Sequence, residues 1–373
     1  MAAAKTPLVL LAAGGTGGHL FPAEALAGAL TRRGVVVDLA TDARAARYAG
    51  HFPARKLHVL PADTVRGRSP LALGKTALAL GSGIFRGYRL MRALRPAAVV
   101  GFGGYPTVPP LLAAHLAGRP TLIHEANAVM GRANALLAKR VTAIATGYPD
   151  IFKDRPELAA KAHHTGNPVR PAVIAAVAPY EPPSAGGRLN LLVFGGSQGA
   201  RVMSEIVPPG IAHLVERLDP AIRARLHIVQ QARPEDIDAV RAVYDRLSVA
   251  AELAPFFSDL PARMADAHLV IARSGASTVA ELGVIGRPSV LVPLPGALDQ
   301  DQLANATALA DGGGAVLMPQ DQFTPERFAA LVALHAAEPG RLAAMAEAAH
   351  RMGRADAAER LADLVIRIAK IDV

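Results

Sequence analysis

The chain has 373 residues, 51% of them hydrophobic and 19% charged, and a net charge of +9. This length exceeds what one ordinary hydrophobic core requires and favours two domains. Because there is no cysteine, a disulfide framework, a zinc–thiolate site and a thiol nucleophile are excluded. The positive charge favours an anionic partner, but the basic residues lack the aromatic interleaving of a nucleic-acid surface, so no nucleic acid is expected.

The N-terminal sequence MAAAKTPLVLLAAGG superficially resembles a signal peptide. Its apolar run leads directly into a glycine turn and an amphipathic segment rather than a cleavage region, which favours the first strand of a fold. No stretch approaches 18 uncharged apolar residues, so no membrane-spanning helix is expected. These features favour a cytoplasmic protein.

Short β-branched or leucine-rich runs then alternate with segments at helical spacing. The first half contains PLVLLAA, VVVDLAT, AAVVGFGG, TLIHEAN and VTAIATG. Such alternation predicts an α/β fold with a parallel sheet covered by helices on both faces.

Residues 166–188 are rich in proline and glycine, and their second half is predicted to be an interdomain linker. The strand and helix pattern then restarts with LNLLVFGGSQGAR, LHIVQQ, AHLVIARSGASTVAELG, PSVLVPLP and GAVLMP. The second half is therefore expected to repeat the architecture of the first. The chain ends in one or two amphipathic helices, the last of which is expected to cross back onto the first domain.

The stretch GGTGGH, residues 14–19, predicts a strand-to-helix turn where an anion approaches backbone N–H groups. It fits no standard fingerprint, since the only GKT motif lacks the first P-loop glycine and Leu20 replaces the third glycine of the dinucleotide pattern. Asp38, about twenty residues further on, keeps a dinucleotide oxidoreductase open as an alternative. Two similar turns, GFGGY at 101–105 and GGSQGA at 195–200, indicate that several phosphates are bound.

Two further motifs carry polar side chains. In RSGASTVAELG, Ser274, Ser277 and Thr278 either cap a helix or admit a nucleotide whose ribose contacts Glu281. The motif IHEAN ends a strand, where open α/β sheets place their chemistry. A single polar residue there, like a single histidine such as His19, is more often structural than catalytic.

The stretch at 66–96 mixes apolar residues with seven basic residues. It is expected to be a helix pair with an apolar face in the core, and its unpaired positive charge also suits a patch on anionic lipid. No HExxH motif or acidic DxD pair is present, so no metal site is expected.

In combination and in this order, GGTGGHLFPAEALA, GFGGY, HEAN, GNPVR, GGSQGAR and RSGASTVAEL resemble the MurG family of peptidoglycan N-acetylglucosaminyltransferases, from the first strand to about residue 310. The resemblance implies a GT-B fold, with two Rossmann-like parallel-sheet domains facing a central cleft. Residues 1–170, with helix 352–373 packed back on them, would be the acceptor and membrane-facing domain. Residues 171–351 would bind UDP-N-acetylglucosamine.

The implied reaction transfers N-acetylglucosamine to the C4 hydroxyl of the N-acetylmuramyl-pentapeptide of lipid I, forming lipid II, with inversion and without a metal. The enzyme would be a peripheral protein on the cytoplasmic face of the inner membrane, with UDP-N-acetylglucosamine, lipid I and an anionic membrane surface as partners. A UDP-N-acetylglucosamine 2-epimerase of the same shape and a non-enzymatic sugar-nucleotide-binding regulator remain as alternatives.

The resemblance also implies the site residues. The acceptor turn would be Gly103, Gly104 and Tyr105. The donor contacts would be Thr16, Gly17, Gly18, Asn127, Arg170, Ser197, Phe257 through its backbone, Ala276, Ser277, Thr278, Val279, Ala280, Glu281 on the ribose, and Gln302 on the sugar hydroxyls. The chain departs from the family at Ala126, commonly glutamine, and in LPGALDQDQ, which leaves a contact of Asp301 open.

An inverting transfer needs a base for the attacking hydroxyl. His19 is the candidate because an imidazole titrates near neutrality, and Glu125 is the alternative base or the group that orients it. Backbone N–H groups at Gly195–Gly199 and Ser274–Ala276, aided by Arg170, are expected to stabilise the departing UDP without a cofactor.

Overall fold

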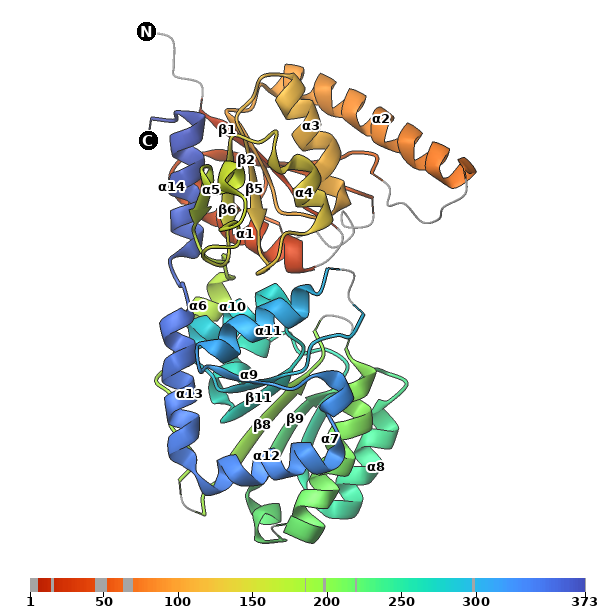
Figure 1. Cartoon of the computed structure of the whole chain (residues 1–373), viewed down its shortest axis with the longest axis vertical. Helices are drawn as coiled ribbons and strands as arrows, with labels where there is room; N and C mark the ends of the chain where they lie inside the picture. The colour runs from red at the N-terminus through yellow and green to blue at the C-terminus, as the bar shows by residue number, and fades with distance from the viewer. Residues whose placement is uncertain are drawn as a thin grey trace. The chain divides into compact units, whose positions relative to one another are not determined.

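The computed structural model describes residues 6–14, 17–43, 52–62, 70–184, 186–196, 199–218, 220–296 and 299–372. The chain divides into two compact units (Figure 1). Unit 1 consists of two segments of the chain, the first up to Arg170 and the second from Ala355 onward. Unit 2 comprises Pro171–Arg354.

Unit 1 is built on a seven-stranded sheet with the order β3-β2-β1-β4-β5-β6-β7, in which every pairing is parallel. Both faces are covered, so its central strands are buried apolar runs, as expected for a parallel sheet. The strands are β1 (Leu8–Ala12), β2 (Val36–Thr41), β3 (Lys56–Val59), β4 (Ala98–Gly101), β5 (Thr121–Glu125), β6 (Ala143–Thr146) and β7 (Ala162–His164).

The helices of unit 1 enclose two apolar clusters, each of which packs on residues of β1, β4 and β5. Residues of α1 and α14 belong to one cluster, and residues of α3 and α4 belong to the other. The helical elements are α1 (Gly17–Arg32), α2 (Pro70–Leu94), η2 (Tyr105–Thr107), α3 (Val108–Leu116), α4 (Arg132–Ala138), α5 (Pro156–Ala159) and α14 (Ala357–Ala369).

The last helix, α14, packs against α1 in unit 1 although the two are more than 300 residues apart in sequence (Figure 1). Leu361 and Leu364 of α14 are buried in the shared cluster. Glu359 accepts from Arg33 at 2.7 Å and from Arg32 at 2.5 Å. The amphipathic C-terminal segment is therefore part of the first unit's core.

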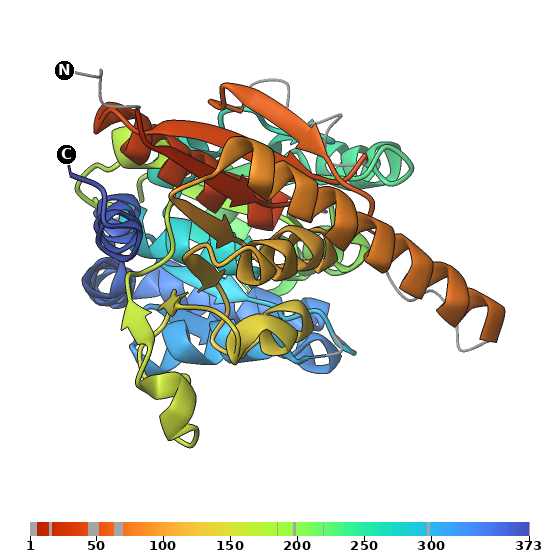
Figure 2. The same cartoon turned by 90° about the horizontal axis from the view of Figure 1, so that it is seen from above.

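Residues 70–94 form one continuous helix, α2, so the expected helix pair is wrong for the described part of 66–96 (Figure 2). The glycines of this stretch favour breaks by propensity, but two of them allow close packing instead. A Cβ atom at Gly83 would collide with the Pro61 carbonyl oxygen, and one at Gly87 would lie 2.9 Å from the Cβ of Ala113 in α3. Tertiary packing therefore outweighs the intrinsic cost of glycine.

Unit 2 repeats the architecture with a six-stranded parallel sheet of order β10-β9-β8-β11-β12-β13. Its strands are β8 (Leu189–Phe194), β9 (Leu226–Gln231), β10 (Ala250–Ala254), β11 (Leu269–Ala272), β12 (Ser289–Leu291) and β13 (Ala315–Leu317). Its helical elements are α6 (Pro171–Ala175), α7 (Arg201–His213), η3 (Leu214–Leu218), η4 (Pro220–Arg225), α8 (Ile237–Leu247), α9 (Leu260–Asp266), α10 (Ala276–Ile285), α11 (Asp301–Asp311), η5 (Gln320–Gln322), α12 (Pro325–Ala337) and α13 (Pro339–Met352).

The strand orders place the motif-bearing loops side by side within each unit. In unit 1, β1, β4 and β5 are adjacent, so the segments that follow them meet at one sheet edge. In unit 2, β8 lies between β9 and β11. In each sheet the chain adds strands on one side of the unit's first strand and then switches to the other side. Open α/β sheets bind ligands at this switch point. The predicted α/β class, with two parallel-sheet units, is confirmed.

Candidate functional site

His19 lies against the glycine turn that follows β4. Gly103 and Gly104 have φ values of 84° and 74°, a region that glycine adopts at little cost. A Cβ atom at Gly103 would lie 3.2 Å from the His19 ring, and one at Gly104 would lie 3.3 Å from it. Because these two residues have no side chain, the His19 imidazole can pack against the turn. Tyr105 follows them as the first residue of η2, and its side chain is exposed.

The start of α1 brings further candidate residues to this place. Gly17 and Gly18 are its first two residues and directly precede His19. Arg170 stacks its guanidinium over the ring of Phe21, 4.2 Å from the centroid. Thr16 and Ser197 lie outside the described residues.

Glu125, the last residue of β5, is held by four hydrogen bonds. Its Oε1 accepts from Asn127 N at 3.0 Å and Asn127 Nδ2 at 3.2 Å, and its Oε2 accepts from Gly131 N at 2.9 Å and Asn134 Nδ2 at 2.8 Å. The pKa of Glu125 is raised overall, because burial raises it more than these donors lower it. The carboxylate therefore fixes the loop that carries Asn127.

His124 is fully buried beside Glu125. Burial, with a smaller contribution from nearby His19, lowers its pKa to about 4, so the ring is neutral near pH 7. Its Nε2 lies 3.2 Å from the Gly166 carbonyl oxygen, and a carbonyl only accepts, so this nitrogen carries the proton. Asn167 Nδ2 donates to Ala126 O at 2.7 Å. These two bonds join the HEAN segment to the GNPVR segment that ends in Arg170.

The segment after β11 in unit 2 begins α10 without a serine or threonine cap. Gly275 occupies the N-cap, and no side-chain cap bond occurs within the described chain. Ser274 Oγ instead donates to Gln302 O at 2.7 Å, so the capping interpretation is wrong. Ala276, Ser277, Thr278, Val279 and Ala280 form the first turns of α10, and Glu281 follows with a buried side chain.

Gln302 lies in the first turn of α11 and is oriented by the backbone. Its Oε1 accepts from Leu294 N at 3.0 Å. Arg273 donates to the Val292 and Pro293 carbonyls at 3.1 and 2.9 Å. Gln302 and Arg273 therefore fix the loop after β12 through its backbone.

Phe257, which is expected to contact the donor through its backbone, is buried in the loop after β10. The Arg263 guanidinium stacks over its ring, 4.3 Å from the centroid. Gln231 is not among the residues expected from the sequence, yet its amide bonds both this loop and the Gly195–Gly196 turn. The only signal in the sequence was a glutamine at the end of an apolar strand.

Asp38 is part of an ion-pair cluster between β2 and β3. Its buried carboxylate accepts from Arg55 twice, both at 2.9 Å, and lies 2.8 Å from His58 Nε2. Burial raises the pKa of Asp38, but the hydrogen bonds from Arg55 and His58 outweigh this and lower it. The carboxylate is therefore committed to side chains of its own sheet, which removes the basis for a dinucleotide site.

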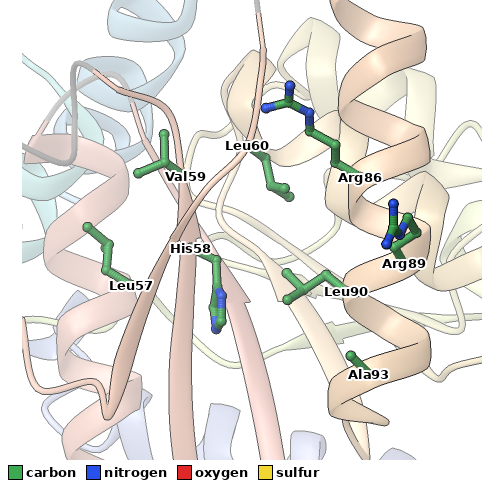
Figure 3. A pocket seen from close by; sticks show the side chains of 8 residues that line it. All are labelled: Leu57, His58, Val59, Leu60, Arg86, Arg89, Leu90 and Ala93. Carbon is green, nitrogen blue, oxygen red and sulfur yellow. The ribbon is translucent and has the colours of Figure 1, made fainter.

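A cavity of about 520 Å³ lies between β3 and α2 (Figure 3). Leu57, His58, Val59 and Leu60 line it from the strand side, and Arg86, Arg89, Leu90 and Ala93 line it from α2. On the outer surface of the helix, Leu78 and Phe85 are 75% and 63% exposed. Spacing at 3.6 residues per turn places Arg89 and Arg92 on the same face as these apolar residues.

Among the described residues, no group of three or more His, Cys, Asp or Glu side chains is placed to hold a metal ion. No helix in the described ranges combines the length and apolarity needed to cross a membrane.

Comparison with known families identifies the chain as a glycosyltransferase, built from two parallel α/β units. The N-terminal domain model of glycosyltransferase family 28 matches residues 9–146, and the C-terminal domain model of the same family matches residues 190–361. The crystal structure of Acinetobacter baumannii MurG covers 97% of this chain and 99% of its own, with a TM-score of 0.79 and 31% identity.

Two curated relatives match nearly end to end. Proteins from Nitrobacter winogradskyi and Rhodopseudomonas palustris are 61% and 62% identical, and each comparison covers 98% of this chain and at least 98% of the relative. Both are named UDP-N-acetylglucosamine–N-acetylmuramyl-(pentapeptide) pyrophosphoryl-undecaprenol N-acetylglucosamine transferase. The chain belongs to this transferase family. A UDP-N-acetylglucosamine 2-epimerase, with 15% identity and a TM-score of 0.66, shares the fold alone.

Replacing Glu125 with glutamine should destabilise the loop after β5. Either orientation of the new amide turns its NH2 group toward two N–H donors, so at least two hydrogen bonds are lost. We expect a cost of about 1–3 kcal/mol, measured as a lower melting temperature and as faster hydrogen exchange at residues 126–131. Glu157→Gln, at an exposed position of α5, is the control and should change little. Equal effects of the two variants would contradict the assignment.

Proposed function

We propose that this chain transfers N-acetylglucosamine from UDP-N-acetylglucosamine to the C4 hydroxyl of the N-acetylmuramyl-pentapeptide of lipid I, forming lipid II, with inversion and without a metal ion. The observation that carries this proposal is the 61% identity over 98% of both chains to a relative named for that transfer. The motifs of both units lie at the strand ends where such a site requires them.

The donor nucleotide is assigned to unit 2. The N-terminus of α10 offers backbone N–H groups and the positive end of the helix dipole to a diphosphate. Ser277 Oγ is buried there without a hydrogen-bond partner among the described residues. Glu281 contacts the ribose, the backbone at Phe257 contacts the uracil, and the Gln302 amide donates to the sugar hydroxyls. Ser197 of unit 2 is also assigned to the donor, and Thr16, Gly17, Gly18, Asn127 and Arg170 of unit 1 are the further donor contacts that the family resemblance implies.

His19 is assigned as the base, and Gly103, Gly104 and Tyr105 are assigned to the acceptor. The C4 hydroxyl gives its proton to the imidazole as its oxygen attacks C1 of the donor sugar. The bond from C1 to the UDP oxygen breaks, and its electron pair leaves with UDP. Glu125 is a positioning residue, since four N–H groups already occupy its oxygens. Arg170 and the α10 N-terminus stabilise the charge of the departing UDP.

The exposed face of α2 is assigned to an anionic membrane surface on the cytoplasmic side, to which the protein binds peripherally. Leu78 and Phe85 provide exposed apolar area, and Arg89 and Arg92 lie on the same helical face. The described helix contains no acidic residue. Because the lipid substrate lies in a membrane, this face supplies attachment on unit 1, the unit assigned to the acceptor.

Replacing His19 with alanine should reduce kcat by about 10²–10⁴-fold, the usual contribution of a general base. The dissociation constant for UDP-N-acetylglucosamine should change far less, because the base acts on the acceptor hydroxyl. Initial rates with a lipid I analogue and calorimetry with the donor alone separate the two quantities. Near-normal turnover in His19→Ala would show that another group is the base.

Replacing Arg89 with glutamine should weaken binding to vesicles of phosphatidylglycerol and phosphatidylcholine by about fivefold, since one basic residue near an anionic surface contributes about 1 kcal/mol. Phe85→Ser should also weaken binding. Arg241→Gln and Leu334→Ser, at exposed positions of unit 2, are the matched controls. Co-sedimentation measures vesicle binding. If the α2 variants bind as well as the controls, the membrane contact does not lie on α2.

A further inference from the structure

Gln231 is a buried amide at the end of β9 that no part of the proposed chemistry uses. The residue is 5% exposed. Its Oε1 accepts from Gly195 N at 3.0 Å, and its Nε2 donates to the carbonyl oxygens of Gly196 at 3.0 Å and Pro255 at 3.1 Å. Gly195 and Gly196 follow β8, whereas Pro255 follows β10. One side chain therefore joins two loops on either side of its own strand.

The chemistry of the partners fixes the orientation of this amide. Gly195 N–H only donates, and the two carbonyls only accept. Both N–H bonds of the amide and its oxygen are thus engaged. No other side chain type of this size offers one acceptor and two donors in this arrangement, so the contact is specific for glutamine.

The turn after β8 depends on the carbonyl that Gln231 holds. Gly196 has a φ of 87°, and its carbonyl also accepts from Gly199 N at 3.1 Å to close the turn. A Cβ atom at Gly195 would collide with the backbone nitrogen of Ala200. The described ends of this turn are therefore close together, and the Gly196 carbonyl that links them is also bonded by Gln231.

The loop after β10 is held at two points. Gln231 bonds the Pro255 carbonyl, and Arg263 stacks on Phe257 two residues later. Arg263 is itself held by Glu252 at 2.7 Å and Asp259 at 2.8 Å. The separation between this loop and the turn after β8 consequently depends on the Gln231 amide.

We propose that Gln231 is a positioning residue that sets the spacing between the diphosphate-binding turn and the uracil-binding loop of the donor site. The proposal rests on the assignment of the donor to unit 2 and adds a determinant of nucleotide affinity that touches no substrate. Loss of the amide lets the two loops separate, which weakens UDP binding and leaves the reacting groups in place.

Gln230 provides a matched control in the neighbouring position. It is fully buried on the opposite face of β9, where it accepts from Tyr244 Oη at 2.5 Å and donates to Met203 O at 3.3 Å. Its partners belong to α7 and α8 rather than to the two loops. Removing its amide therefore has a comparable cost in stability without altering loop spacing.

The test compares Gln231→Met with Gln230→Met in the full chain, using UDP as the probe. Calorimetry should show UDP binding at least about tenfold weaker in Gln231→Met, the effect of losing about one or two hydrogen bonds, and nearly unchanged in Gln230→Met. With donor and lipid I analogue, KM for the donor should rise with little change in kcat. Hydrogen exchange at Gly195 should accelerate only in Gln231→Met.

Gln231→Asn, which keeps the amide but is one methylene too short to bond both loops, should lose an intermediate share of affinity and serves if Gln231→Met does not fold. UDP affinity equal to wild type in a folded Gln231 variant would overturn the positioning role. Wild-type protein that binds UDP but transfers no sugar to lipid I would overturn the proposed function and leave the Gln231 comparison valid.

Discussion

Backbone groups that leave the end of a buried parallel strand have no neighbouring strand to pair with, and burying them unpaired is costly. In unit 1, Glu125 at the end of β5 accepts hydrogen bonds from Asn127, Gly131 and Asn134. In unit 2, Gln231 at the end of β9 supplies one acceptor and two donors. A polar side chain whose donors and acceptors match the loop backbone satisfies this constraint in each case, and the functional loops depend on it.

In the proposed mechanism, the groups that shape the site are distinct from the groups that react. Glu125 is buried, and its oxygens accept four hydrogen bonds that hold the loop after β5. His124 is buried and neutral, and it donates to the GNPVR segment. His19 lies against the two glycines of the turn after β4. The proposed base His19 contacts this turn closely, which restricts its orientation before the acceptor arrives.

The periodicity of the chain and its glycine turns predicted two parallel-sheet units, and the strand orders confirm this. The helix pair expected at 66–96 was wrong in the described residues because propensity counts the glycines of α2 as breaks, whereas Gly83 and Gly87 serve its packing. The strand-end position of Glu125 was predictable, but its three partner residues were not, since Asn134 lies on a separate helix. Gln231 was missed for the same reason: its value lies in loops about 25 to 35 residues away that only the sheet order brings together.

The central claim is that this chain itself carries out metal-independent, inverting sugar transfer to a diphosphate-linked lipid. The most direct measurement supplies UDP-N-acetylglucosamine labelled in the sugar and a lipid I analogue, with and without EDTA, and determines the anomeric configuration of the product by NMR. The account predicts label in the lipid fraction as a β-linked disaccharide, at the same rate with EDTA. Label that stays in the nucleotide fraction, epimerisation of the donor, an α-linked product or loss of activity in EDTA would contradict it.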